Sequence, residues 1–123
     1  MDEGNKYREN RIELKLSGTV IERKQLGIAV VGSGRIGTLR ARLAAEHPAV
    51  NFLAVSDLAE GNARKLAQKV GAQVCSTSNR EIIARPEVTA VIVSTSEGAH
   101  LEPVLAAIEL GKPVRVEKPI AQS

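Results

Sequence analysis

The sequence predicts an α/β fold: a doubly wound parallel sheet of the Rossmann type, with helices on both faces in a three-layer αβα arrangement. Three observations predict it. Apolar strands alternate with amphipathic helices from residue 26 to residue 116. A G-x-G-x-x-G turn joins the first of these strands to the first helix. The core has to be aliphatic, because 43% of the 123 residues are hydrophobic and only 2% are aromatic. Aliphatic runs suit parallel strands, which are buried on both faces.

Short apolar runs predict the strands, at residues 26–32, 50–57, 72–76, 88–95 and 113–116. Helical periodicity predicts the helices between them, at residues 35–47, 61–71, 80–86 and 100–111. Gly71 and Gly111 are placed to end two of these helices. Ser78 and Glu81 form a capping box at the start of a third. Helical crossovers of this length join parallel strands with a right-handed connection, which makes the sheet doubly wound.

Apolar spacing also predicts which helix faces are buried: Ile36, Leu39 and Leu43 in the first helix, Ala63, Leu66, Ala67 and Val70 in the second, and Leu101, Val104, Leu105 and Ile108 in the last. Cys75 is expected to be a small buried hydrophobe.

Residues 1–25 form an N-terminal extension that differs from the predicted Rossmann domain at residues 26–123. Apolar and polar residues alternate at 12–17, which predicts a half-buried strand that Gly18 would end. The segment carries no recognisable chemistry. An added edge strand, an oligomer contact and a flexible native or artificial extension all remain open for it.

Composition argues against several classes of function. A net charge of +3 without a basic stripe, and with almost no aromatic residues to stack bases, disfavours a nucleic-acid partner. The single cysteine excludes a disulfide framework and disfavours a zinc site, so we expect no metal. No apolar run approaches the roughly 18 residues of a spanning helix, and the N-terminus has no signal-peptide core. We therefore expect a cytoplasmic protein with no membrane contact.

The glycine motif at Gly32, Gly34 and Gly37 predicts a dinucleotide site, because it follows a strand and opens a helix. The first glycine permits the tight turn, the second lets a pyrophosphate approach the backbone, and the third lets the helix press against the strand. The helix N-terminus then offers N–H groups to the phosphates. Arg35 either flanks the pyrophosphate or is a solvated helix residue, and Ile36 is a further contact candidate within the motif.

Asp57 ends the second strand, about 20 residues beyond the motif, where dinucleotide folds place an acid. A carboxylate there accepts hydrogen bonds from the ribose hydroxyls and repels a 2′-phosphate, so NAD is favoured over NADP. The alternative is that Asp57 only caps the next helix.

Two other strand ends lie at the expected ligand crevice, between the first and fourth strands of the domain. The fourth strand leads into "STSEGAH" and the fifth into "VEKP". Together with "GIAVVGSGRIG" and "STSEGAHLEPVLAAIELGKPV", the segment "VEKPIA" resembles the N-terminal domain of the Gfo/Idh/MocA oxidoreductases, relatives of glucose–fructose oxidoreductase and inositol dehydrogenase. The resemblance covers roughly residues 25–123, and its E-K-P motif is more specific than its glycine motif.

The resemblance implies roles for residues at these strand ends. Lys118 matches the family lysine that lies by the substrate hydroxyl and the nicotinamide, where it would orient substrate and help move its proton. Glu117 matches the glutamate beside the nicotinamide ribose, and Pro119 fixes the turn. The alternative is that Lys118 is an ordinary surface lysine.

The loop after the fourth strand carries further candidates. Thr95 and Ser96 match the backbone that lines the nicotinamide side, and His100 matches the histidine that follows this loop. His100 is a catalytic candidate, or it only satisfies backbone groups at the helix start. Relatives usually have T-P-N where this chain has Thr95, Ser96 and Glu97, so the loop here lacks the proline that restricts the backbone and gains a negative charge.

In the family, the chain continues into a C-terminal α+β domain that holds the substrate and makes oligomer contacts. The sequence resembles the NAD-binding part alone, so we expect either a fragment of a larger enzyme or the product of a truncated gene. The expected function is hydride transfer between nicotinamide and a carbinol carbon of a sugar, cyclitol or similar polyol, with a homo-oligomer left open. Two alternatives remain: a stand-alone, non-catalytic NAD-binding regulatory module, and a nucleotide enzyme of another kind such as a methyltransferase.

Overall fold

The structure, a computed structural model, describes residues 11–16, 19–24 and 26–117. Its main sheet is five-stranded and parallel throughout, in the order β5-β4-β3-β6-β7. These strands are β3 (Leu26–Val31), β4 (Val50–Ser56), β5 (Val74–Ser76), β6 (Ala90–Val93) and β7 (Val114–Val116). The helices are α2 (Arg35–Glu46), α3 (Glu60–Val70), α4 (Asn79–Ile83) and α5 (Leu101–Glu109), with a short 3₁₀ helix η1 (Glu97–Ala99). The predicted doubly wound Rossmann class is confirmed.

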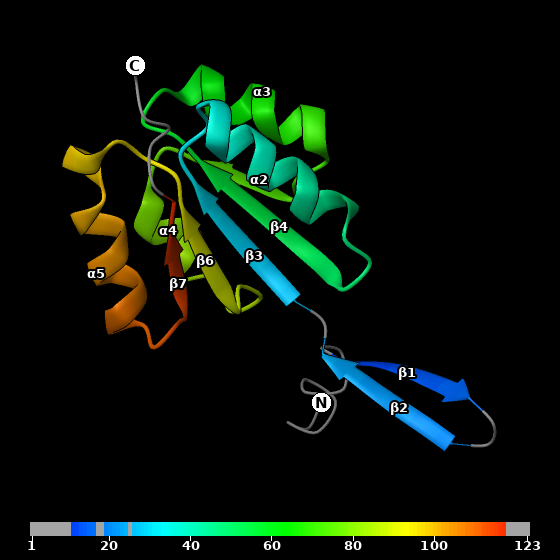
Figure 1. The fold of residues 1–123 in the computed structure, drawn as a ribbon. Helices are drawn as coiled ribbons and strands as arrows, with labels where there is room; N and C mark the ends of the chain where they lie inside the picture. Colours follow the sequence, from blue (N-terminus) through cyan, green and yellow to red (C-terminus); the bar gives the residue numbers. More distant parts are fainter. Residues whose placement is uncertain (1–10, 17–18, 25, 118–123) are drawn as a thin grey trace, which may run out of the picture.

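The sheet lies between two helical layers (Figure 1), with α2 and α3 on one face and α4 and α5 on the other. Strand β3 shows how the alternating side chains serve both layers. Ile28 and Val30 pack with the α2–α3 layer, whereas Ala29 and Val31 pack with the α4–α5 layer. Burial on both faces explains why β3 is apolar throughout rather than alternating with polar residues.

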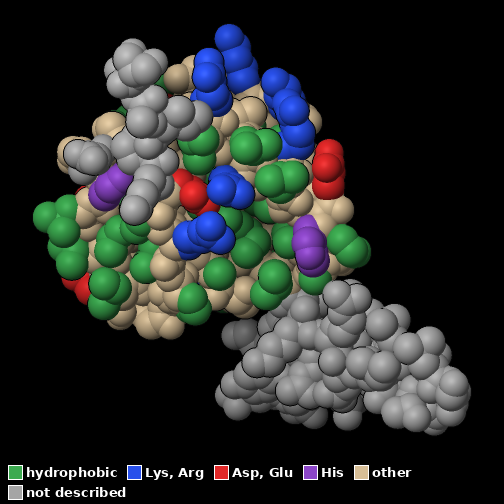
Figure 2. Space-filling view, in the orientation of Figure 1, with side chains coloured by type: hydrophobic (Ala, Val, Ile, Leu, Met, Phe, Trp, Pro, Cys, Tyr) green, Lys and Arg blue, Asp and Glu red, His purple; other side chains and the backbone are tan. Residues whose placement is uncertain are grey.

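Two of the predicted helix faces are wrong. In α2 the buried residues are Gly37, Ala41 and Ala44, while Leu39 and Leu43 are 44% and 48% exposed. In α5 the buried residues are Pro103, Ala106 and Ala107, and the exposed ones include Leu101, Leu105 and Ile108. Apolar side chains are accordingly visible on the surface over α5 (Figure 2). Both helices approach the sheet through small residues, so the larger apolar residues at helical spacing face outward. In α3 the predicted face is confirmed, with Ala63, Leu66 and Ala67 buried.

At the start of α4, the structure confirms one of the two hydrogen bonds of the predicted capping box. The hydroxyl of Ser78 accepts a hydrogen bond from the backbone N–H of Glu81 at 3.2 Å. The carboxylate of Glu81 accepts instead from the hydroxyl of Ser76, at 2.8 Å. Beyond the other end of the helix, the Lys112 ammonium donates to the carbonyls of Ile83 and Arg85, at 2.5 and 2.7 Å. Ile83 is the last residue of α4, so its carbonyl is one that the helix leaves open, whereas the Arg85 carbonyl also accepts from the Val88 N–H.

Cys75 is exposed, contrary to the expectation of burial. It lies on β5, which is short and at the edge of the sheet, so the outward-facing side chain of the strand is left uncovered.

The predicted strand at 12–17 appears as β1 (Arg11–Leu16). It pairs in antiparallel register with β2 (Thr19–Lys24), a strand that the sequence analysis missed, and the two form a sheet of their own. Among the residues that the structure describes, no helix is long and apolar enough to cross a membrane.

Candidate functional site

A cavity of about 430 Å³ opens at the carboxyl ends of the parallel strands. Strands β3 and β6 are neighbours in the sheet, and the chain leaves them toward opposite helical layers, so this is the switch point where doubly wound sheets bind ligands. The cavity is lined by Gly32, Ser33, Gly34, Asp57, Leu58, Asn79, Ser94, Thr95, Ser96, Ala99 and Glu102. The glycine loop, the acid after β4 and the loop after β6 therefore meet in one place, as the sequence predicts.

Each glycine of the motif is required, or accommodated, by a different feature of the local geometry. Gly32 has a φ of +98°, which side chains rarely adopt, and so turns the chain sharply at the end of β3. A Cβ added at Gly37 would lie 1.8 Å from the carbonyl oxygen of Gly32, so α2 can approach the loop this closely only through a glycine. A Cβ added at Gly34 would meet no heavy atom of the described chain within 4 Å. It would project into the open space that a phosphate would need.

The N-terminus of α2 begins directly at this loop. Gly34 is its N-cap residue, and no side chain caps the first N–H groups. The first turn also carries no acidic residue. Uncapped N–H groups and the positive end of the helix dipole make this position suited to an anion such as a pyrophosphate.

Asp57 ties the acid-bearing strand end to the glycine loop. Its Oδ2 accepts from the backbone N–H of Ser33 at 2.9 Å and also from the Ser33 hydroxyl, while Oδ1 accepts from the backbone N–H of Ala59 at 2.9 Å. Burial acts to raise the pKa of Asp57, but these hydrogen bonds, with one from Asn62, outweigh it and hold the pKa below its usual value. The carboxylate is therefore ionised at neutral pH. Its bond to the Ala59 N–H closes the turn that precedes α3. Ala59 itself is the N-cap residue of α3 and no side chain caps that helix, so Asp57 is not the helix cap that the sequence left open as the alternative.

The loop after β6 supplies the opposite wall. Thr95 and Ser96 line the cavity, and the Thr95 hydroxyl lies 3.0 Å from Nδ1 of His100. His100 is the N-cap residue of α5, is half-buried, and is not among the residues that line the cavity. Its imidazole is thus placed to orient the hydroxyl of Thr95.

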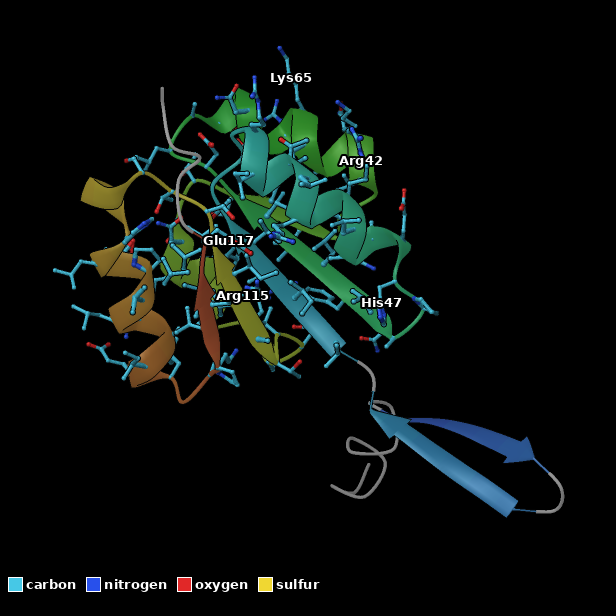
Figure 3. All side chains as sticks on the ribbon, viewed as in Figure 1. Arg42, His47, Lys65, Arg115 and Glu117 are labelled. Atoms are coloured by element: carbon cyan, nitrogen blue, oxygen red, sulfur yellow. The ribbon has the colours of Figure 1, made fainter. Side chains whose placement is uncertain are left out.

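Glu117, at the end of β7, is held by arginines. Its Oε1 lies 2.7 Å from Nε of Arg40, and its Oε2 accepts a hydrogen bond from Nη2 of the same residue at 3.3 Å. Nε of Arg115 lies 3.4 Å from Oε1. The Glu117 side chain is only 12% exposed, and this ion pair joins α2 to the end of the edge strand β7, where Figure 3 labels Glu117 and Arg115. Glu117 does not line the cavity in this arrangement.

The remaining predicted residues lie around the loop or outside the described chain. Arg35 is exposed and Ile36 is half-buried at the start of α2, and neither lines the cavity. Lys118 and Pro119 lie outside the described residues, so their predicted roles rest on the resemblance alone.

Sequence reasoning missed several residues of this region, among them Ser33, Arg40, Asn79 and Glu102. Ser33 stands inside the glycine motif, where its hydroxyl could have been paired with Asp57 from the known geometry of that turn. Arg40 and Glu102 occur on helix surfaces, where charged residues are common, and Asn79 follows an N-cap. Nothing in their spacing sets them apart. In the described part of the chain, no group of three or more His, Cys, Asp or Glu side chains is placed to hold a metal ion.

Comparisons with known proteins agree with this geometry. Residues 26–123 match the model of the Gfo/Idh/MocA family, described as an oxidoreductase family with an NAD-binding Rossmann fold. The chain belongs to this family. The resemblance inferred from the E-K-P and glycine motifs is therefore confirmed, and with it the assignment of NAD as the cofactor of this type of domain.

Individual relatives give the same picture. The chain is 42% identical over 99 residues to inositol 2-dehydrogenase of Gluconacetobacter diazotrophicus, covering 78% of this chain and 29% of that protein. It is 37% identical over 100 residues to 2,7-anhydro-N-acetylneuraminate hydratase of Mediterraneibacter gnavus, covering 81% and 26%. Among solved structures, GenD2 from gentamicin A biosynthesis, in complex with NAD, superposes with a TM-score of 0.72 at 34% identity, covering 78% and 27%. The chain thus spans less than a third of the length of these relatives.

Proposed function

We propose that this chain is the NAD(H)-binding part of an oxidoreductase that transfers hydride between nicotinamide and a carbinol carbon of a sugar, cyclitol or similar polyol. The observation that carries the proposal is the convergence of Gly34, Asp57 and the loop after β6 on one cavity at the sheet switch point. NAD, when bound, supplies the hydride-accepting and hydride-donating carbon. The relatives named inositol 2-dehydrogenase support the substrate class.

The chain's own residues then have definable tasks. The uncapped start of α2 and the open space at Gly34 fit a pyrophosphate. The ionised carboxylate of Asp57 fits the two hydroxyls of the adenosine ribose, and its charge disfavours a 2′-phosphate. Thr95 and Ser96 form the wall toward the nicotinamide in this proposal. Glu117, held by Arg40, would fix the backbone that leads into Lys118, which we propose as the residue that orients substrate and moves its proton.

Substrate binding is proposed to involve a second domain, because the matched part covers only 29% of inositol 2-dehydrogenase. Positioning a substrate against nicotinamide requires groups on both sides of it. A cytoplasmic location is part of the proposal, because a reducing compartment suits the single exposed thiol of Cys75. The match to a hydratase means that the reaction type has to be tested separately from cofactor binding.

Calorimetric titration of the 123-residue chain with NADH and then NADPH tests the cofactor site; the chain has no tryptophan to report binding by quenching. We expect saturable NADH binding and weaker NADPH binding. Gly34→Val should abolish both, because its side chain occupies the phosphate position, whereas Gly61→Val on α3, which also projects into open space, should not. Equal binding by the Gly34 variant and the unmodified chain would refute the site.

The reaction type is tested by incubating the complete protein with NAD and inositols or related polyols, and measuring NADH formation. We expect NADH to form with a cyclitol or sugar and the Lys118→Met variant to lose this activity while still binding NADH. Loss of NADH binding together with activity would assign Lys118 to the cofactor instead.

A further inference from the structure

A pair of side chains that lines the cavity has no role in the site as described so far. Asn79, the first residue of α4, donates from its amide nitrogen to Oε1 of Glu102 in the first turn of α5, at 2.9 Å. Both residues line the cavity, on the side of the α4–α5 layer. We call them the Asn79–Glu102 pair.

A hydrogen bond from a buried serine sets the orientation of the Asn79 amide in this pair. Ser56, the last residue of β4, is fully buried, and its hydroxyl donates to Oδ1 of Asn79 at 2.8 Å. With its oxygen committed to Ser56, the Asn79 amide presents nitrogen, not oxygen, to Glu102. A primary amide nitrogen carries two N–H groups and a carboxylate has two oxygens. The pair therefore keeps one donor on Asn79 beside one acceptor on Glu102.

The position of the pair relative to Asp57 indicates which part of a dinucleotide reaches it. Leu58 directly follows Asp57, lines the same cavity and is 80% exposed. A nucleoside whose ribose hydroxyls bind Asp57 would place its base beside Leu58 and Ala99, both apolar. The flat faces of the base would then be covered by apolar groups, and its polar edge would face a donor and an acceptor.

We propose that the Asn79–Glu102 pair recognises the adenine edge, with the second N–H of Asn79 donating to N7 and the second oxygen of Glu102 accepting from the N6 amino group. Adenine presents a donor at N6 beside an acceptor at N7, whereas a 6-oxopurine presents two acceptors there. A 6-oxopurine would set its O6 against the Glu102 carboxylate. This inference rests on the proposed cofactor function and makes the site selective for adenine dinucleotides.

The test compares NADH with reduced nicotinamide hypoxanthine dinucleotide, whose base has O6 in place of the amino group and carries a hydrogen on N1, while N7 is unchanged. Calorimetry on the 123-residue chain should show the hypoxanthine analogue binding about 5- to 150-fold more weakly, the range expected for a two-point contact to adenine. In Glu102→Ala we expect NADH affinity to fall and the ratio between the two ligands to drop to about threefold or less. Glu102 is exposed, so this variant should fold.

Glu109→Ala is the matched control. It removes an exposed carboxylate from the same helix, one that pairs with Arg80 at 2.9 Å and does not line the cavity. The control should keep the full ratio. If the unmodified chain binds both ligands equally, or if Glu102→Ala weakens both by the same factor, the inference is wrong while the proposed cofactor site stands. If neither ligand binds, the proposed function and the inference both fail.

Discussion

The approach of α2 to the glycine loop can be tested by adding one methyl group. In Gly37→Ala the new Cβ would lie 1.8 Å from the carbonyl oxygen of Gly32 and 2.7 Å from its carbon, and both are backbone atoms that no rotamer change can move. Since Cβ atoms essentially never lie within 3.0 Å of such atoms, α2 and the loop have to separate by at least 1.2 Å. Overpacking of this kind costs about 1–3 kcal/mol. For a domain of this size that lowers Tm by at least about 4 °C.

The assay is thermal unfolding followed by helical circular dichroism. Two other glycines serve as controls in the same series. Gly34→Ala meets no heavy atom of the described chain within 4 Å, so it should lower Tm less than Gly37→Ala does, by no more than the cost of alanine at an N-cap, while NADH binding weakens. Gly61→Ala lies in α3 with the same open space and should raise the free energy of unfolding by up to about 1 kcal/mol. An unchanged Tm for Gly37→Ala would refute the reasoning, because the helix would then not be held at the distance the structure gives.

Three further changes test other contacts. Because the pKa of Asp57 is lowered in the folded state, its carboxylate stabilises the fold above the unfolded pKa of about 3.9 and loses that contribution as the pH falls through the folded value. The stability difference between the unmodified chain and Asp57→Asn, from denaturant titrations, should therefore be constant near neutrality and shrink below about pH 4; a difference independent of pH would contradict this. Arg40→Met should lower the free energy of unfolding by about 1–3 kcal/mol by leaving the Glu117 carboxylate without its main partner. In a double-mutant cycle with Glu117→Gln the two losses should be less than additive, and strict additivity would show that the pair is not coupled. Lys112→Met should lower the free energy of unfolding in urea by about 1 kcal/mol, since the Ile83 carbonyl loses the Lys112 donor and the Arg85 carbonyl keeps only the Val88 N–H. The exposed Lys65→Met should have little effect, and an equal loss in both variants would contradict this role of Lys112.

Much of the fold and part of the site follow from local sequence. Strand and helix order, the turn at Gly32 and the half-buried acid at Asp57 depend on short-range pattern: apolar runs, helical spacing and a glycine motif whose geometry is the same wherever it occurs. The E-K-P motif identified the family, because this motif is specific enough to be recognised without a structure. These features need no knowledge of which distant residues come into contact.

Other features were decided only when the chain folded. Which face of α2 and α5 is buried depends on how closely each helix can approach the sheet. Small residues such as Gly37 and Ala106 allow the closest approach, so they are buried in place of the leucines that helical spacing favours. The ion pair between Arg40 and Glu117 joins residues 77 positions apart, and the Asn79–Glu102 pair joins residues 23 apart. No local pattern in the sequence marks such partners, because a parallel sheet brings its strand ends and helix starts together through long crossovers rather than through neighbouring residues.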